Sequence, residues 1–400
     1  MLRNSHVRPP RPIGPATRLA IITLAIWTGA TASTLLFAQP KPRARQLGVP
    51  FNGTPGPLNA ITDVAGIEVG HTTLIEGSGT LVAGKGPVRT GVTAILPKGK
   101  TWQPVFAGWF AGNGFGEMTG SPWIVEGGVL GGPVMITGTY SVGIVRDAVN
   151  SWFHEVLKRE ISWHQPVVGE TSDAFLNDGI GQHVTKTHVF AALNGARGGA
   201  VPEGNVGGGT GMVAHGFKGG IGTSSRRVGS TYTLGALVQA NYGTRESLTI
   251  AGVPVGREIQ GADRRRGANA PAVDRDGSII VVVATDAPLL PHQLERLARR
   301  VPMGIARLGG TASNGSGDIF LAFSTANPGA AAETGPTPLT WLPNNDLTPF
   351  FDATVEATEE AIVNALVAAE TMAGINGNTV SALPTDQLRA ILKKYNRLGQ

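Results

Sequence analysis

The sequence contains no cysteine, and this absence excludes several kinds of chemistry. Without thiols the chain forms no disulfide, no thiolate nucleophile and no cysteine-based metal site. Charged side chains are also scarce, at 15% of the residues, against about 25% in typical soluble domains. A large assembly, in which neighbouring copies cover much of the surface, would tolerate so low a charge.

Acidic residues are absent from the first 46 positions, which hold seven lysines and arginines. Since seven of the positive charges lie there, the whole-chain charge of +5 leaves −2 for the remainder. The basic character therefore belongs to the N-terminal segment. A weakly acidic body gives no reason to expect a nucleic-acid partner.

The N-terminal segment has the layout of a secretory signal peptide. Arg18 is followed by an uncharged stretch, residues 19–37, and small residues precede two candidate cleavage sites, after Ala32 and after Ala38. This layout places the body outside the cytoplasm, in the periplasm or secreted. An uncleaved membrane anchor is the alternative, because the stretch is nearly long enough to span a bilayer. The chain then divides into a signal peptide (1–38), a linker (39–54) and a single folded domain (55–400).

Glycine (57 residues) and proline (27) are abundant, yet 41% of the residues are hydrophobic, which indicates a loop-rich globular protein. The apolar patterns predict strands at 91–96, 105–110, 133–138, 231–238, 247–251, 279–284 and 318–324, and helices at 141–158, 291–308 (kinked at Pro302), 348–373 and 387–395. Strands with long helices between them indicate a layered α/β (α+β) domain, in which helices cover buried sheets.

Nucleotide and metal motifs are incomplete in this chain. The P-loop-like stretch 94–101 lacks the first glycine, and the motif His-Glu-x-x-His is absent. The glycine-dense stretch 204–223 does not stand between a strand and a helix in the order that a nucleotide fold needs. We therefore expect no cofactor and no metal. The glycines are expected to let backbone segments pass close together.

The most informative stretch is Gly277-Ser278, which directly precedes an unbroken apolar run, residues 279–284. A run of this kind predicts a strand that is buried on both faces. Glycine leaves space for the Ser278 hydroxyl to attack the Gly277 carbonyl, and cleavage there would make Ser278 a new N-terminus. Its α-amine, with a reference pKa of about 7.7–8.0, can then act as the base for its own hydroxyl. The alternative is a loop serine that caps a strand.

A second turn, Asn314-Gly-Ser-Gly-Asp318, also stands at the entry of a predicted buried strand. If the two strands are neighbours, Ser316 and Asp318 reach the amine and the hydroxyl of Ser278. A carboxylate in that place orients and polarises the amine. The alternative is a plain Asn-Gly turn.

Several stretches together resemble one known family of enzymes. They are residues 59–73, 112–120, 140–149, 204–226, 237–243, 277–291 and 313–320. On these stretches the chain is similar to the β-peptidyl aminopeptidases and the L-aminopeptidase/D-Ala-esterase/amidase (DmpA-like) group.

That resemblance implies an αββα sandwich like that of ornithine acetyltransferase. It implies a precursor that cleaves itself into an α chain (to 277) and a β chain (278–400), which stay together in homo-oligomers, a tetramer or larger. The implied activity is metal-free release of N-terminal β-, D- or L-amino acids from short peptides, amides or esters.

The resemblance also implies roles for the matching residues. Ser278 matches the family's nucleophile, and Ser316 and Asp318 match its supporting pair. Asn241 matches the side chain that donates to the oxyanion. Some members have glutamate where Asp318 stands, so the shorter side chain here implies an altered geometry.

Substrate binding is implied for three further residues. Glu170 is the candidate partner for the ammonium group of the substrate. Glu117 is an alternative partner, or a buried structural acid in a glycine turn. Ser172 stands where members of the family often carry an aromatic residue, which implies a different or roomier pocket.

Two other functions stay open at this stage. An acyltransferase on the same fold would transfer its acyl group to an amine faster than to water. A non-catalytic, exported binding protein would neither cleave itself nor turn over a ligand. The sequence leaves open the preference among β-, D- and L-residues, the physiological peptide and the size of the assembly.

Overall fold

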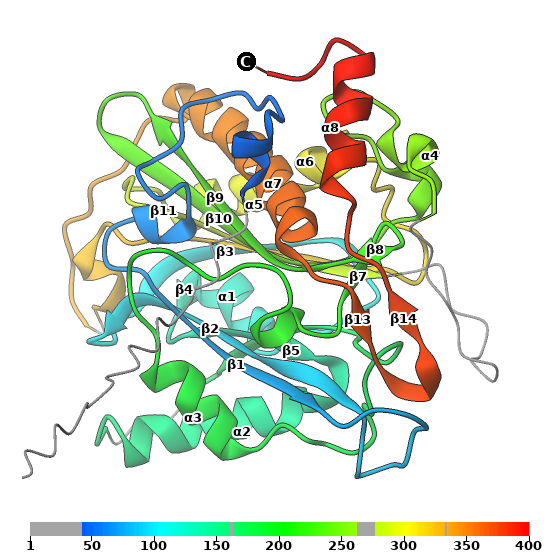
Figure 1. Cartoon of the computed structure of the whole chain (residues 1–400). Helices are drawn as coiled ribbons and strands as arrows, with labels where there is room; N and C mark the ends of the chain where they lie inside the picture. Colours follow the sequence, from blue (N-terminus) through cyan, green and yellow to red (C-terminus); the bar gives the residue numbers. More distant parts are fainter. Residues whose placement is uncertain (1–41, 160–163, 262–276, 333, 400) are drawn as a thin grey trace, which may run out of the picture. The chain divides into compact units, whose positions relative to one another are not determined.

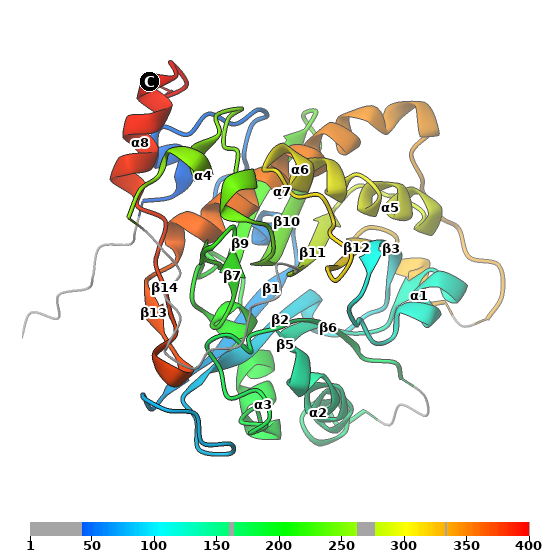
Figure 2. The same ribbon diagram turned by 90° about the vertical axis from the view of Figure 1, so that its right-hand side faces the viewer.

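The computed structural model describes residues 42–159, 164–261, 277–332 and 334–399. In this part of the chain two β-sheets lie face to face, and helices cover the outer face of each sheet (Figures 1 and 2). Apolar side chains from both sheets, Ile136 and Leu237 among them, form a core between them. The predicted αββα sandwich is confirmed.

The first sheet has the strand order β1-β2-β5-β6, in which β5 and β6 are parallel and the other pairs antiparallel. Two helices, α2 and α3, cover its outer face (Figure 2), where Val149, Trp152 and Val189 pack against the sheet. The bounds are β1 (Glu68–Glu76), β2 (Val88–Lys100), β5 (Val134–Gly138), β6 (Val167–Thr171), α2 (Val142–Glu155) and α3 (Lys186–Asn194).

The second sheet has the strand order β4-β3-β12-β11-β10-β9, in which β11 and β12 are parallel. Three helices, α5, α6 and α7, lie on its outer side (Figures 1 and 2). The bounds are β3 (Val105–Gly114), β4 (Val129–Leu130), β9 (Gly220–Val228), β10 (Tyr232–Asn241), β11 (Ser278–Thr285), β12 (Gly317–Ser324), α5 (Pro291–Ala298), α6 (Val301–Arg307) and α7 (Thr348–Ala368).

Smaller elements complete the described chain. They are α1 (Ser121–Gly127), β7 (Val213–Ala214), β8 (Phe217–Lys218), α4 (Val255–Glu258), β13 (Met372–Ala373), β14 (Thr379–Val380) and α8 (Thr385–Lys394). Within the described ranges no helix is both long enough and apolar enough to cross a membrane.

The central strand β11 shows why its sequence is apolar throughout. Ile279 and Val281 face the helices on the outer side, whereas Ile280 and Val282 face the core between the sheets. Successive side chains of a strand point to opposite faces, so a strand covered on both faces needs an unbroken apolar run.

Three predicted elements differ from the structure. The helix predicted at 348–373 ends at Ala368, because Ala369 has an extended backbone (φ −66°, ψ 151°), and Met372–Ala373 form the short strand β13. Residues 247–251 are not a strand, because Ala251 and Gly252 both adopt positive φ (53° and 76°) and turn the chain back. The helix predicted at 291–308 is two helices, and Pro302 stands in the first turn of the second, where its missing N–H costs no hydrogen bond.

The predicted signal peptide, 1–38, lies outside the described residues. In the described part of the segment 39–54, predicted as a linker, Ala44, Leu47 and Val49 are buried in the same hydrophobic core as residues of α7. Arg45 of the same segment is ion-paired with the fully buried Glu360.

Candidate active site

Three neighbouring strands of the second sheet have one end each at the same side of the sheet, where β11 and β12 begin and β10 ends. β11 begins at Ser278, which pairs in register with Asn241, the last residue of β10. β12 runs parallel to β11 and begins at Gly317, so Ile279 pairs with Asp318. The two strand-entry motifs of the sequence are therefore neighbours in space.

Ser278 is half-buried, and its Oγ accepts a hydrogen bond from the Gly317 N–H at 3.2 Å. The preceding residue, Gly277, packs directly against the backbone of β10. A Cβ placed on Gly277 would lie 2.0 Å from the Asn241 carbonyl oxygen, closer than two such atoms can approach. Glycine is therefore required at the predicted cleavage site by packing as well as by chemistry.

Ser316 and Asp318 form a buried pair, in which the Ser316 hydroxyl donates to Oδ1 of Asp318 at 2.6 Å. Burial raises the pKa of Asp318, although hydrogen bonds from Ser316 and from the Ile279 N–H act in the opposite direction. The Asp318 carboxylate thus lies beside the backbone next to the Ser278 nitrogen. The Ser278 hydroxyl contacts the Gly317 N–H and not the Ser316–Asp318 pair.

The turn that carries Ser316 is held by Asn113 of β3. Its Nδ2 donates to the carbonyls of Ser313 and Asn314, at 2.9 and 3.1 Å. No role is predicted for Asn113 from the sequence. The signal that could have found it is its place in Gly112-Asn-Gly, a polar residue at the end of an apolar strand.

Asn241 is buried and held at both ends of its carboxamide. Its Oδ1 accepts from the Val213 N–H at 2.8 Å, and its Nδ2 donates to the Ser172 carbonyl at 3.1 Å. Because Val213 supplies a donor and Ser172 an acceptor, the orientation of the amide follows from its partners. Nδ2 carries a second hydrogen, which has no acceptor among the residues that the structure describes. The side chain of Ser172 is exposed, and the group of Ser172 that contacts Asn241 is the backbone carbonyl.

Glu170, the last residue but one of β6, is 5% exposed. Its carboxylate accepts from the Glu117 N–H at 3.0 Å and from the Thr139 hydroxyl, and burial raises its pKa. The side chain of Glu117 is exposed, so the alternative of a buried structural acid is wrong. Thr139 is not among the predicted site residues, because its only signal in the sequence is its place at the end of an apolar strand.

Gly116 lies close both to the Glu170 carboxylate and to Gly317, the residue whose N–H contacts the Ser278 hydroxyl. A Cβ placed on Gly116 would lie 2.9 Å from Cα of Gly317 and 3.3 Å from Oε1 of Glu170. The structure therefore brings the Glu170 carboxylate close to the segment whose N–H contacts the Ser278 hydroxyl. The six residues Ser278, Ser316, Asp318, Asn241, Glu170 and Ser172 gather at one edge of the two sheets.

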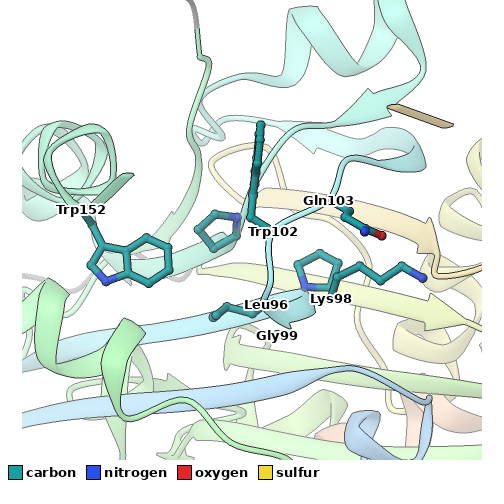
Figure 3. Close-up of a pocket in the computed structure, with 9 residues that line it drawn as sticks. Leu96, Lys98, Gly99, Trp102, Gln103 and Trp152 are labelled. Atoms are coloured by element: carbon teal, nitrogen blue, oxygen red, sulfur yellow. The ribbon is translucent and has the colours of Figure 1, made fainter. Parts of the chain in front are cut away.

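A separate hollow lies at the far end of β2, between Trp102 and Trp152 (Figure 3). Its volume is about 10 Å³, room for about one water molecule, so it is too small for a substrate. Among the residues that the structure describes, no group of three or more histidines and acids is arranged to hold a metal ion.

Comparisons with known proteins give matches over most of this chain. The sequence model of peptidase family S58 matches residues 59–380. The chain is 55% identical over 371 residues to the β-peptidyl aminopeptidase BapA of Sphingosinicella microcystinivorans, covering 90% of this chain and 93% of that one. It is 50% identical over 393 residues to BapA of Sphingosinicella xenopeptidilytica, covering 93% and 98% of the two chains.

A solved structure is also similar. It is the L-aminopeptidase D-Ala-esterase/amidase from Ochrobactrum anthropi, described as a prototype for the serine aminopeptidases and a variant of the Ntn hydrolase fold. The TM-score is 0.83 at 46% identity, and the match covers 90% of this chain and all of that chain.

Proposed function

The chain belongs to peptidase family S58 and is a serine-type aminopeptidase, and on this premise we propose that it releases N-terminal residues, β-amino acids among them, from short peptides, amides and esters. The observation that carries the proposal is the register of three strands. It aligns Ser278 with Asn241 across one ladder and places Asp318 in the neighbouring strand.

The first step of the proposal is self-cleavage between Gly277 and Ser278. The Ser278 Oγ attacks the Gly277 carbonyl, a C–O bond forms, the C–N bond breaks, and the hydroxyl proton moves to the departing nitrogen. Water then hydrolyses the ester, which leaves a carboxylate on Gly277 and a free α-amine on Ser278. Each half of the cut chain keeps its place, because strand pairing and the shared core hold both.

In turnover the freed amine is the base and the Ser278 hydroxyl the nucleophile. The amine takes the hydroxyl proton as Oγ attacks the substrate carbonyl, and the second hydrogen on Nδ2 of Asn241 stabilises the oxyanion. The leaving amine or alcohol departs with that proton, and water hydrolyses the acyl-enzyme. Ser316 and Asp318, which are hydrogen-bonded to each other, hold the α-amine in position in this proposal.

Glu170 selects substrates with a free N-terminus in this proposal. Its carboxylate is fixed by two donors and buried, so an ammonium group that reaches it forms a strong, desolvated ion pair. The exposed Ser172 leaves more room at the pocket than an aromatic side chain would. That room supports acceptance of the longer backbone of a β-residue.

Export and assembly also belong to the proposal. Residues 1–38 direct the chain to the periplasm or out of the cell, and the cut chains stay together in a homo-oligomer. The supports are the signal-peptide layout and the low charge of 15%. Light scattering of protein recovered from the periplasm gives the mass of the assembly, and a mass of about 40 kDa, close to the 41.4 kDa single chain, would contradict an oligomer.

Intact mass under denaturing conditions tests the central claim. The wild type is expected to give two chains, the smaller beginning at Ser278, and Ser278→Ala a single chain that hydrolyses neither amides nor β-peptides. Ser230→Ala, in the exposed turn between β9 and β10, serves as control and is expected to cleave and turn over normally. A wild-type chain that stays whole after long incubation at neutral pH, or ready hydrolysis by Ser278→Ala, would contradict the proposal.

A further inference from the structure

Lys218 of β8 is a fully buried lysine. Its Nζ donates to three backbone carbonyl oxygens, of Met212 at 2.8 Å, Gly219 at 2.9 Å and Gly209 at 3.3 Å. In the described part of the chain no carboxylate forms an ion pair with it. Burial of an ammonium group without a counter-charge costs several kcal/mol, and burial lowers the pKa of Lys218 to about 7. So costly a group calls for a role that an apolar side chain could not fill.

The backbone segments that Lys218 binds, at residues 209–212 and at residue 219, pack closely against β9 and β10. A Cβ on Gly209 would lie 2.5 Å from the Ile221 nitrogen, and a Cβ on Gly219 would lie 2.3 Å from the Ala240 carbonyl oxygen. Glycines at these positions thus allow the loop to reach the end of β10, where Asn241 lies.

One peptide unit connects Lys218 with Asn241. The Met212 carbonyl and the Val213 N–H belong to the same peptide group, whose oxygen accepts from Lys218 and whose nitrogen donates to Asn241 at 2.8 Å. Protonated Lys218 has three N–H donors, one for each of its three carbonyl partners. In this form its positive charge at the Met212 oxygen polarises the peptide and makes the Val213 N–H a stronger donor. The Asn241 amide is polarised in turn, which makes its Nδ2 hydrogens better donors.

We propose that Lys218 is a positioning residue, which orients and polarises the Asn241 carboxamide through the Met212–Val213 peptide and thereby strengthens its bond to the oxyanion. The inference rests on the proposed role of Asn241. It predicts that Lys218 acts on the rate of the chemical step, since the oxyanion exists in the transition state and not in the bound substrate.

A double-mutant cycle tests the connection. Lys218→Met is made in the wild type and in Asn241→Ala, and kcat and KM are measured with an amino-acid amide. Rates are normalised to the fraction of cut chains, which intact mass provides. In the wild-type background we expect kcat to fall about 10- to 100-fold, as for a lost charge-assisted hydrogen bond, with KM within about twofold. In the Asn241→Ala background the same change is expected to alter kcat less than about twofold.

Lys98→Met is the matched control. Lys98, at the hollow shown in Figure 3, also donates to a backbone carbonyl, that of Thr325. Within the described residues no hydrogen bond links Lys98 or the Thr325 peptide to Asn241. Its kcat is expected to stay within about twofold of the wild type. If Lys218→Met does not fold, Lys218→Gln, which keeps two donors and loses the charge, enters the same cycle.

The outcomes separate the two proposals. Equal losses of kcat in both backgrounds, or no loss in the wild type, would overturn the positioning role of Lys218 and leave the oxyanion role of Asn241 intact. An unchanged kcat in Asn241→Ala alone would overturn the oxyanion role, and the inference about Lys218 would fall with it.

Discussion

At the scale of single residues, the site contains two buried carboxylates with different partners. Asp318 accepts from Ser316 and lies beside the strand that begins at Ser278, whereas Glu170 accepts from Thr139 and from the backbone of Glu117. Burial raises the pKa of both. Their places relative to Ser278 lead us to expect that Asp318 acts on the amine of the enzyme and Glu170 on that of the substrate.

Asp318→Asn is expected to lower the maximal kcat about 10²-fold, because the amine loses the group that orients it. A carboxylate beside an amine stabilises the protonated form, so its removal lowers the amine pKa. The acidic limb of the pH–rate profile should therefore move to lower pH. The measurement is kcat against pH with an amino-acid amide.

Asp286→Asn is the control for this substitution. Asp286 follows the opposite end of β11, accepts from the Thr233 N–H and also has a pKa raised by burial. Its profile should match that of the wild type. An acidic limb that stays in place in Asp318→Asn would argue against an action on the amine.

At the scale of elements, contacts between backbones decide which strand ends meet. Gly277 packs against β10, and Gly317 packs against Gly116, with a Cβ on Gly317 only 2.7 Å from Cα of Gly116. Side chains at these positions would separate the elements that carry the site. Glycine at these positions allows the backbones of neighbouring elements to approach each other closely.

Gly277→Ala is expected to slow self-cleavage at least tenfold, since the added Cβ would lie 2.0 Å from the Asn241 carbonyl and displace the bond to be cut. A misplacement of about 1 Å is enough to cost 10²-fold in rate. Intact mass against time after purification measures the effect. Gly114→Ala, where a Cβ meets no atom within 4 Å, should cleave like the wild type. Equal cleavage rates in the two variants would contradict the packing argument.

At the scale of the whole molecule, the segment that follows the predicted signal peptide is bound to distant parts of the chain. Arg45 pairs with Glu360 of α7, which also pairs with the buried Arg226 of β9. Arg43 pairs with Glu203 in the same region. Cleavage after Ala32 or after Ala38 would leave both arginines in the mature protein.

Arg45→Ala is expected to lower the free energy of unfolding by about 1–3 kcal/mol, because the fully buried carboxylate of Glu360 loses one of its two arginine partners. Urea unfolding measures the change. Arg299→Ala removes an exposed pair with Glu295 and should cost less than about 0.5 kcal/mol. Similar small losses in both variants would show that the segment contributes little to stability.

The layers of the fold could be predicted because burial on two faces leaves a mark on the sequence. Residues 279–284 of β11 and 319–323 of β12 are apolar without interruption. β9 was not predicted, since glycines dominate its beginning. There a Cβ on Gly222 would lie 2.0 Å from the Ala361 carbonyl, so the close crossing of α7 requires glycine where strand propensity is low.

By itself the sequence determined the class of chemistry: a chain without thiols, with a serine after glycine at the entry of a buried strand and motifs that resemble one family. Which groups meet depends on how the strands are arranged in the folded chain. That arrangement puts the Gly317 N–H on the Ser278 hydroxyl, the Val213 N–H on Asn241, and the Glu117 backbone, not its side chain, on Glu170. These contacts join segments that are far apart in the chain. They are determined by strand order and by packing between the layers, and local sequence patterns encode neither.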